Sequence, residues 1–186
     1  MPRKKINKIK IIDVTNRDGV QTSRLGLAKL QKTMINLYLN EMGVYQTEFG
    51  FPVTHHETNY INANLALARK GGLKPIILEG WVRAIKDDVI KATKLTKVQH
   101  LNLSISTSDQ MIKGKFAGRY GREDIINLMV QAVKTAKKEG IRTIGVNAED
   151  ASRTDMDYLV QFSLAAKEAG ACRIRYCDTL GYDDPF

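Results

Sequence analysis

Short apolar segments alternate along this chain with longer amphipathic ones. Apolar and β-branched residues are concentrated at positions 9–14, 44–49, 74–79, 98–105, 141–146 and 172–177, and amphipathic segments occupy 25–42, 57–70, 84–95, 122–139 and 154–169. Near-continuous apolar runs are typical of strands covered on both faces, whereas apolar positions three and four residues apart predict helices. Strict alternation of the two with short connections predicts right-handed crossovers and a parallel sheet.

Two parallel folds fit this pattern: a complete doubly wound sheet, or the first three-quarters of a (β/α)8 TIM barrel. A dinucleotide-binding sheet needs G-x-G-x-x-G after its first strand, but here R-D-G-V-Q follows, and the chain has no P-loop. Polar residues follow several predicted strands, and in a parallel barrel all these strand ends meet at one mouth. We therefore predict an incomplete TIM barrel of about six βα units, with residues 1–186 forming the N-terminal portion of one catalytic domain and no second domain.

The composition changes this picture little. The net charge is +9, yet the lysines beyond the first ten residues fall at helical spacing and no basic stripe is interleaved with aromatic residues. This pattern argues against nucleic-acid binding, whereas a polyanionic cofactor or substrate would use the same charge. No apolar run approaches the roughly 20 residues that span a bilayer, and no signal-peptide pattern is present, so we expect no membrane span and a cytoplasmic location.

The polar residues after the first predicted strand are candidates for chemistry. Asp18 is suited to a hard divalent cation, Arg17 to a carboxylate or oxyanion, and Gln21 to hydrogen bonds with a ligand. The alternative is structural: Arg17 and Asp18 pair with each other and cap the following helix. The spacing alone leaves both interpretations open.

The fifth predicted strand ends in an acidic pair with the same ambiguity. One carboxylate of Glu149-Asp150 is expected to face the barrel mouth, while Asp150 and Arg153 make a structural pair.

The remaining histidines, tryptophan and cysteines have mostly structural interpretations. His55 and His56 are expected in a loop or helix start, and His100 is expected to pack inside a strand. Trp81 fits a pocket wall and core packing equally well. Cys172 and Cys177 are expected to point to opposite faces of one strand, as two free thiols.

Five motifs in strand order resemble one enzyme family. They are "DVTNRDGVQ", "TEFGFP", "LSISTSDQMIKGKF", "EDASRTD" and "DTLG". Together they resemble the metal-dependent acyl-CoA condensing barrels, namely the 2-isopropylmalate, citramalate and homocitrate synthases, with hydroxymethylglutaryl-CoA lyase as a relative. The resemblance implies an acyltransferase that condenses acetyl-CoA with a 2-oxo acid and hydrolyses the thioester, using a divalent cation (Mg, Mn or Zn) as Lewis acid.

The resemblance also implies roles for individual residues. Asp18 would bind the cation, Arg17 would stabilise the developing oxyanion, and Gln21 would contact the 2-oxo acid. Glu149 would take part in substrate binding and proton transfer, and Thr179 would lie near the acid's carboxylate.

The fourth- and fifth-strand motifs look most like the nitrogen-fixation type of homocitrate synthase, which uses 2-oxoglutarate. Gly145 and Asn147 replace the arginine and serine of lysine-pathway homocitrate synthases, which leaves open how a distal carboxylate is held. Arg83 is the candidate for that contact, and Asn147 is expected to bind substrate. Alternatives are a 2-isopropylmalate or citramalate synthase, a lyase of the same barrel, or a non-catalytic assembly subunit.

The family's seventh-strand H-x-H, which supplies its other metal ligands, is absent from this sequence. Open strands at both edges of a six-stranded parallel sheet also demand a covering partner. We therefore expect the chain alone to be inactive or nearly so, and to act only with a missing C-terminal part, with a complementing chain or as a homo-oligomer.

Overall fold

The computed structural model describes residues 9–184, which form one six-stranded parallel sheet. The strands are β1 (Ile12–Asp13), β2 (Gln46–Gly50), β3 (Ile77–Arg83), β4 (His100–Ser106), β5 (Thr143–Glu149) and β6 (Arg173–Tyr176). Each strand lies beside its predecessor, in the order β1-β2-β3-β4-β5-β6. A doubly wound sheet reverses its strand order, whereas a barrel does not. The order thus confirms the predicted incomplete TIM barrel.

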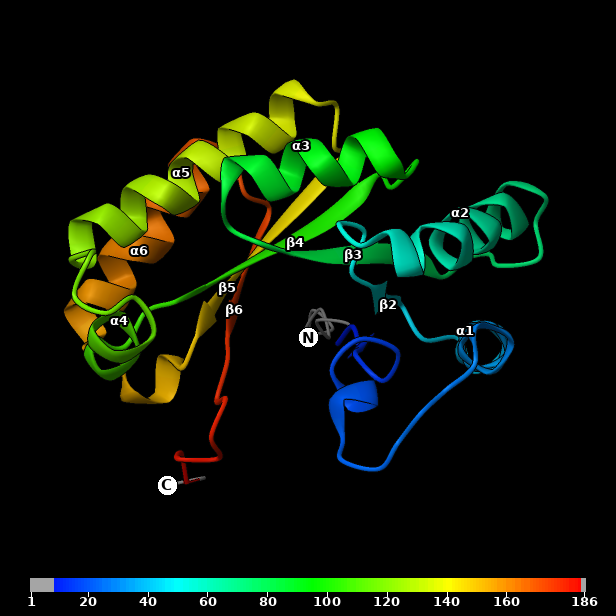
Figure 1. The fold of residues 1–186 in the computed structure, drawn as a ribbon, viewed down its shortest axis with the longest axis horizontal. Coiled ribbons are helices and arrows are strands. Elements are labelled where there is room, and N and C mark those ends of the chain that lie inside the picture. Colours follow the sequence, from blue (N-terminus) through cyan, green and yellow to red (C-terminus); the bar gives the residue numbers. More distant parts are fainter. Residues whose placement is uncertain (1–8, 185–186) are drawn as a thin grey trace, which may run out of the picture.

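Six α-helices are described, and five of them pack against strands of this sheet. The six are α1 (Lys29–Glu41), α2 (His55–Arg69), α3 (Lys86–Leu95), α4 (Asp109–Lys115), α5 (Arg122–Lys138) and α6 (Met156–Ala169), with 3₁₀ turns at Gly19–Gln21 and Ala151–Arg153. Figure 1 shows the resulting arch, with the blue N-terminal segment and the red C-terminal segment on either side of its opening. No helix in the described range is long and apolar enough to cross a membrane.

Helix α4 was not expected from the hydrophobic pattern. It follows β4 directly, and the Ser108 side chain caps it by accepting a hydrogen bond from the Met111 N–H. A serine at this position supplies a partner for one of the unpaired N–H groups of the first turn. The short helix ends at Lys115, which places a basic side chain beside the strand ends.

The apolar core lies between the convex face of the sheet and the helices. Leu101 and Leu103 of β4 are fully buried there against Met129 of α5 and Phe162 of α6. Each such side chain contributes roughly 1.5–3 kcal/mol through removal of its apolar surface from water. This layer holds the sheet in its curved form.

The concave face of the sheet is polar, which the predicted strands did not anticipate. Arg173 of β6 donates to Glu79 of β3 at 2.7 and 2.8 Å, and these two strands are not neighbours in the sheet. Such a contact requires the sheet to curl until its inner side chains meet. Because inward positions carry polar residues, most of the observed strands continue past the points where the apolar runs stop.

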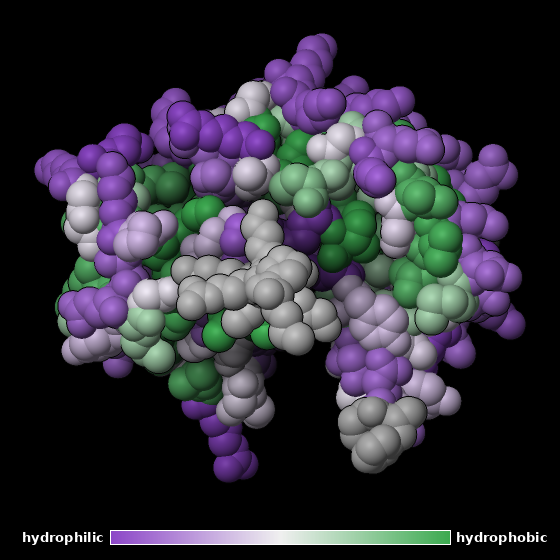
Figure 2. Space-filling model, turned by 180° about the vertical axis from the view of Figure 1, so that it is seen from behind, coloured by the Kyte–Doolittle hydropathy of each residue, from purple (hydrophilic) through white to green (hydrophobic). Residues whose placement is uncertain are grey.

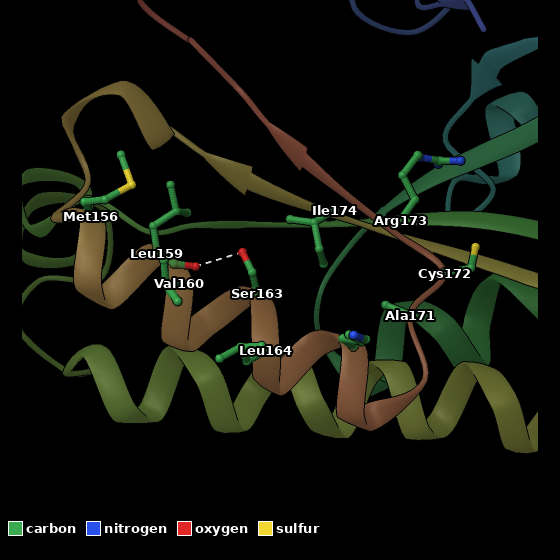
Figure 3. Close-up of a pocket in the computed structure, with 10 residues that line it drawn as sticks. Met156, Leu159, Val160, Ser163, Leu164, Ala171, Cys172, Arg173 and Ile174 are labelled. Atoms are coloured by element: carbon green, nitrogen blue, oxygen red, sulfur yellow. Dashed lines mark hydrogen bonds between the residues drawn. The ribbon is translucent and has the colours of Figure 1, made fainter. Parts of the chain in front are cut away.

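An apolar groove of about 560 Å³ lies between α6 and β6 on the outer side. Met156, Val160 and Leu164 line it from α6 and are half or more exposed. Figure 3 shows Ile174 pointing from β6 toward α6, whereas Arg173 points to the opposite side of the strand. Among the described residues β6 pairs only with β5, so the groove continues into an open strand edge. Figure 2 likewise shows apolar patches between polar side chains on the rear of the molecule.

Candidate active site

A cavity of about 480 Å³ opens at the C-terminal ends of the strands. Strand ends and loops of all six βα units contribute to its lining, as a parallel barrel requires. Six of the residues expected at the mouth line this cavity: Arg17, Asp18, Gln21, Asn147, Glu149 and Thr179.

Arg17 is held in place by an aromatic ring and a carboxylate. Its guanidinium carbon lies 3.6 Å from the centre of the Trp81 ring, and Nη1 lies 2.7 Å from Asp18 Oδ1. A stacked guanidinium of this kind gains about 0.5–2 kcal/mol, depending on desolvation. Burial lowers the pKa of Arg17, and the negative charges of Asp18 and Glu149 oppose that shift. Trp81 therefore walls the cavity and orients a cation in it.

Asp18 is more exposed than Arg17, its neighbour in the turn after β1. Its side chain is 61% exposed, and only Oδ1 is engaged by Arg17. The structural alternative is thus half realised: the pair forms, but the Asp18 side chain makes no capping bond to the following 3₁₀ turn. Asp18 therefore lines the cavity with its Oδ1 atom engaged by Arg17.

Glu149 is paired with a lysine that the sequence analysis missed. Lys115 Nζ lies 2.9 Å from Glu149 Oε2 and 3.1 Å from Ser106 Oγ. Lys115 lies in α4, a helix that the hydrophobic pattern did not reveal. A basic residue in the last turn of a short helix was the available signal.

The neighbouring acid, Asp150, takes the structural role. Its carboxylate accepts hydrogen bonds from Arg153, the shortest at 2.5 Å, and from the Ser108 hydroxyl. The Arg153 hydrogen bond holds the pKa of Asp150 below its usual range. Its backbone N–H donates to Thr179 Oγ1 at 2.9 Å. The expected Asp150–Arg153 pair is therefore confirmed, and it fixes Thr179 beside the cavity.

A second arginine lies inside the mouth. Arg175 Nε donates to Asn147 Oδ1 at 2.7 Å, and Arg175 Nη2 is paired with Glu48. Glu48 is only 2% exposed and also accepts from Asn102 Nδ2 at 2.6 Å. Burial lowers the pKa of Arg175. The alternation of arginine and apolar residues in "CRIRYC" was the signal for this inward position.

A buried charged layer lies below this one. The Arg173–Glu79 pair described above lies at the level of Gly145, which pairs with Arg173 in the sheet. A Cβ on Gly145 would lie 2.5 Å from Asn102 Oδ1 and 3.0 Å from Arg173 Cζ. Glycine at this position is therefore what makes room for an arginine from the next strand.

Arg83 is not brought to this cavity, although it was expected there. Its side chain is 61% exposed and makes a bidentate contact with Asp88 of α3, at 2.7 and 2.8 Å. The hydrogen bonds that Arg83 donates to Asp88 raise the pKa of Arg83. The β3–α3 turn is short enough for Asp88 to hold the guanidinium, which turns it away from the mouth.

The histidines and cysteines lie where their structural interpretations placed them. His55 and His56 begin α2, and His100 of β4 contacts Thr143 Oγ1 through Nδ1 at 2.7 Å. Cys172 and Cys177 flank β6 as free thiols.

The residues described do not by themselves fit a divalent metal ion. Within residues 9–184, no three His, Cys, Asp or Glu side chains lie close enough together to hold one. Glu48 and Glu149 are engaged by Arg175 and Lys115, which leaves Asp18 as one exposed carboxylate.

Comparison with known proteins identifies similar sequences over nearly the whole chain. The model of the HMGL-like family matches residues 8–186. A citrate (Re)-synthase of Dehalococcoides mccartyi is 62% identical over 97% of this chain and 44% of its own length. A 2-isopropylmalate synthase 2 of Caldanaerobacter subterraneus is 42% identical over 100% of this chain and 46% of its own length. A homocitrate synthase of Methanocaldococcus jannaschii is 36% identical over 99% of this chain and 44% of its own length.

This chain therefore spans less than half the length of these relatives. Among solved structures, an HMG-CoA lyase from Acenitobacter baumannii, in complex with coenzyme A and 3-methylmalate, superposes with a TM-score of 0.73. The two are 17% identical, and the match covers 95% of this chain and 58% of the lyase. At that identity the likeness concerns the fold.

Proposed function

Since the chain belongs to the HMGL-like family, we propose that it is part of an acyltransferase that condenses acetyl-CoA with a 2-oxo acid. The relatives named above are synthases that make citrate, 2-isopropylmalate and homocitrate. Products of this kind arise when an acetyl group adds to the keto carbon of a 2-oxo acid. The runner-up is the lyase direction on the same barrel, in which the same carbon–carbon bond breaks.

One observation carries this proposal: three cations converge on one cavity. Arg17, Lys115 and Arg175 all line it, each from a different part of the chain. Each has a carboxylate partner within the same cavity, so the site is charged but balanced. An anionic substrate can replace one of these carboxylates as the partner of its cation. The cation then keeps a partner of opposite charge and is not left buried and unpaired.

This charge distribution favours a 2-oxo acid with two carboxylates. Arg17 suits the reacting end, and Arg175 with Asn147 suits a distal carboxylate. An apolar side chain, as in 2-oxoisovalerate, would make no ion pair with Arg175. The position of Arg83 outside the cavity supports Arg175 in its place.

We infer that oxaloacetate, which gives citrate, is the first choice of acid. The relative that is 62% identical is named a citrate (Re)-synthase, whereas the homocitrate synthases of Methanocaldococcus jannaschii and Nostoc are 36% and 33% identical. The second candidate is 2-oxoglutarate, which would give homocitrate in a nitrogen-fixation setting, as the fourth- and fifth-strand motifs suggested.

The residues of this chain divide the proposed reaction between them. A base removes a proton from the acetyl methyl group, and Glu149, held by Lys115, is the proposed base. The enolate carbon then forms a bond to the keto carbon, and the electron pair of the C=O bond moves to its oxygen. Arg17 stabilises this oxyanion, and the proton that Glu149 removed returns to the oxygen, which gives the hydroxyl group and regenerates the base. Gln21 and Thr179 orient the acid. Water finally cleaves the thioester C–S bond and releases coenzyme A.

We also propose Asp18 as one ligand of a divalent cation. Its second oxygen is uncommitted, but residues 9–184 supply no further cluster of ligands around it. The proposed steps above therefore rest on side chains of this chain alone. The proposed reaction involves neither a nucleic acid nor a membrane, and we propose that it takes place in the cytoplasm.

A covering partner is proposed for the open edge of β6. Helices α3, α5 and α6 pack side by side along the outer face of the sheet. The groove lies beside α6, the last of these helices (Figure 3). A further βα unit, with a parallel strand on β6 and an apolar helix face on Val160 and Leu164, fits the groove. A second copy of this chain is the alternative source.

Release of free thiol from acetyl-CoA tests the function. The chain is mixed with, or fused to, the remaining C-terminal part of the Dehalococcoides mccartyi relative, with and without Mg²⁺, Mn²⁺ or Zn²⁺. Turnover is expected with oxaloacetate above 2-oxoglutarate, and above pyruvate and 2-oxoisovalerate. A preference for 2-oxoglutarate would overturn only the choice of oxaloacetate as the acid. No turnover with any acid would overturn the proposal that the protein is a synthase.

A further inference from the structure

We propose that Asn16 is a positioning residue that holds Arg17 on Trp81 through a buried relay of amide side chains. Asn16 lies in the turn after β1, directly before Arg17, and is 0% exposed. Its Nδ2 donates at 2.8 Å both to the backbone oxygen of Lys32 and to Asn36 Oδ1. The turn that carries Arg17 is thus bonded to the middle of α1. Only the catalytic consequence of this placement rests on the proposed function.

The relay continues from α1 into α2. Asn36 Nδ2 donates to the Tyr60 hydroxyl at 2.9 Å and to Asn64 Oδ1 at 3.0 Å, and Asn64 Nδ2 donates to Thr33 Oγ1 at 3.0 Å. Asn36 and Asn64 are both 0% exposed. A buried amide is costly unless its partners are in place, so each member fixes the orientation of the next.

A second branch of the same network reaches Trp81 from the other side. The backbone oxygen of Lys32 accepts the hydrogen bond from Asn16, and Lys32 Nζ donates to Glu57 Oε1 at 2.6 Å. Glu57 Oε2 in turn accepts from the Phe51 N–H at 2.5 Å. The Phe51 ring packs edge-on against Trp81, with centroids 5.5 Å apart. The two branches therefore hold both partners of the Arg17–Trp81 stack.

The turn itself needs this support because it is poorly anchored elsewhere. β1 has only two residues, and the N–H groups of Arg17 and Asp18 both bond locally to the Val14 oxygen. Local bonds preserve the shape of the turn but do not fix its position against the sheet. Without Asn16, the turn can pivot, and Arg17 leaves the ring.

Trp81 is the only tryptophan in the sequence, so its fluorescence reports this stack directly. Asn16→Ala is expected to shift the emission to the red and to increase quenching by acrylamide, reaching the values of Arg17→Ala. Asn62→Ala is the matched control, because the Asn62 amide also bonds to backbone groups outside the relay. It donates to the Leu95 oxygen and accepts from the Lys97 N–H. This variant is expected to lower stability and leave the fluorescence unchanged.

Two further measurements keep the proposal decidable. Tyr60→Phe removes only the far hydroxyl of the relay, and it is expected to give a smaller shift in the same direction even if Asn16→Ala does not fold. In the complemented enzyme, Asn16→Ala should lower kcat more than it raises KM. An unchanged Trp81 signal in folded Asn16→Ala or in Tyr60→Phe would overturn the positioning role. A changed signal with no enzymatic turnover in any variant would overturn the proposed function instead.

Discussion

Adding one methyl group to Gly145 is expected to break the buried charged layer. The new Cβ would lie 2.5 Å from Asn102 Oδ1 and 3.0 Å from Arg173 Cζ, so both side chains would have to move. Neither is free to move, because Asn102 donates to Glu48 and Arg173 donates to Glu79, which is 0% exposed.

The magnitude follows from two costs. Overpacking a core position costs about 1–3 kcal/mol, and removing one partner of a fully buried ion pair costs about 3–5 kcal/mol. The Arg173 side chain is 23% exposed, so water can solvate part of its charge when the contact with Glu79 is broken, and the cost is lower. We expect Gly145→Ala to lower the free energy of unfolding by about 2–4 kcal/mol, which moves a urea midpoint by about 1–2 M.

The pH dependence separates this cause from general disruption. Burial raises the pKa of Glu79, and Arg173 opposes that shift. Without its partner, Glu79 has a folded-state pKa further above the unfolded value. Stability is then retained at acidic pH, where the carboxyl is protonated, and is lost as the pH rises through the folded-state pKa. The deficit of Gly145→Ala should therefore grow from acidic to neutral pH.

Urea unfolding followed by circular dichroism measures these effects. Gly26→Ala is the matched control, since no atom lies within 4 Å of its Cβ position, and it is expected to be neutral. Adding Glu79→Gln to Gly145→Ala should abolish the pH dependence. A Gly145→Ala midpoint equal to that of the control would refute the reasoning.

Four other outcomes are expected. Asp150→Asn should lower the free energy of unfolding at pH 7 by about 1.5–3 kcal/mol, because a charged hydrogen bond to Arg153 is lost. That hydrogen bond lowers the pKa of Asp150, so the wild-type protein should lose stability as the pH falls from about 4 downward. The variant should not show this loss, and acid titration would measure the difference. Lys115→Met should change the melting temperature little, as expected for a partly exposed pair, yet slow thiol release in the complemented enzyme. Arg83→Ala should leave that activity unchanged, and a large loss would return Arg83 to the site. Asp18→Asn should abolish metal-dependent turnover in the same assay; retained turnover would remove Asp18 from the metal site.

The order of the elements and the mouth residues could be predicted from the sequence. Helical and strand periodicities are local properties, and strict alternation leaves few parallel topologies. Once the strands are parallel, all their C-terminal ends face one side. For that reason Arg17, Asp18, Gln21, Glu149 and Thr179 could be assigned to one cavity before any coordinates, and the structure brings them together.

The partners of these residues were decided by the tertiary structure alone. Pairs such as Glu48–Arg175 and Glu79–Arg173 join strands that are not neighbours, so they depend on how far the sheet curls. Curvature arises from the packing of helices on the convex face, which no local pattern encodes. The same cause brings Lys115 to Glu149. Local periodicity thus determines which elements form and in what order, whereas the curvature of the sheet determines which charges meet inside it.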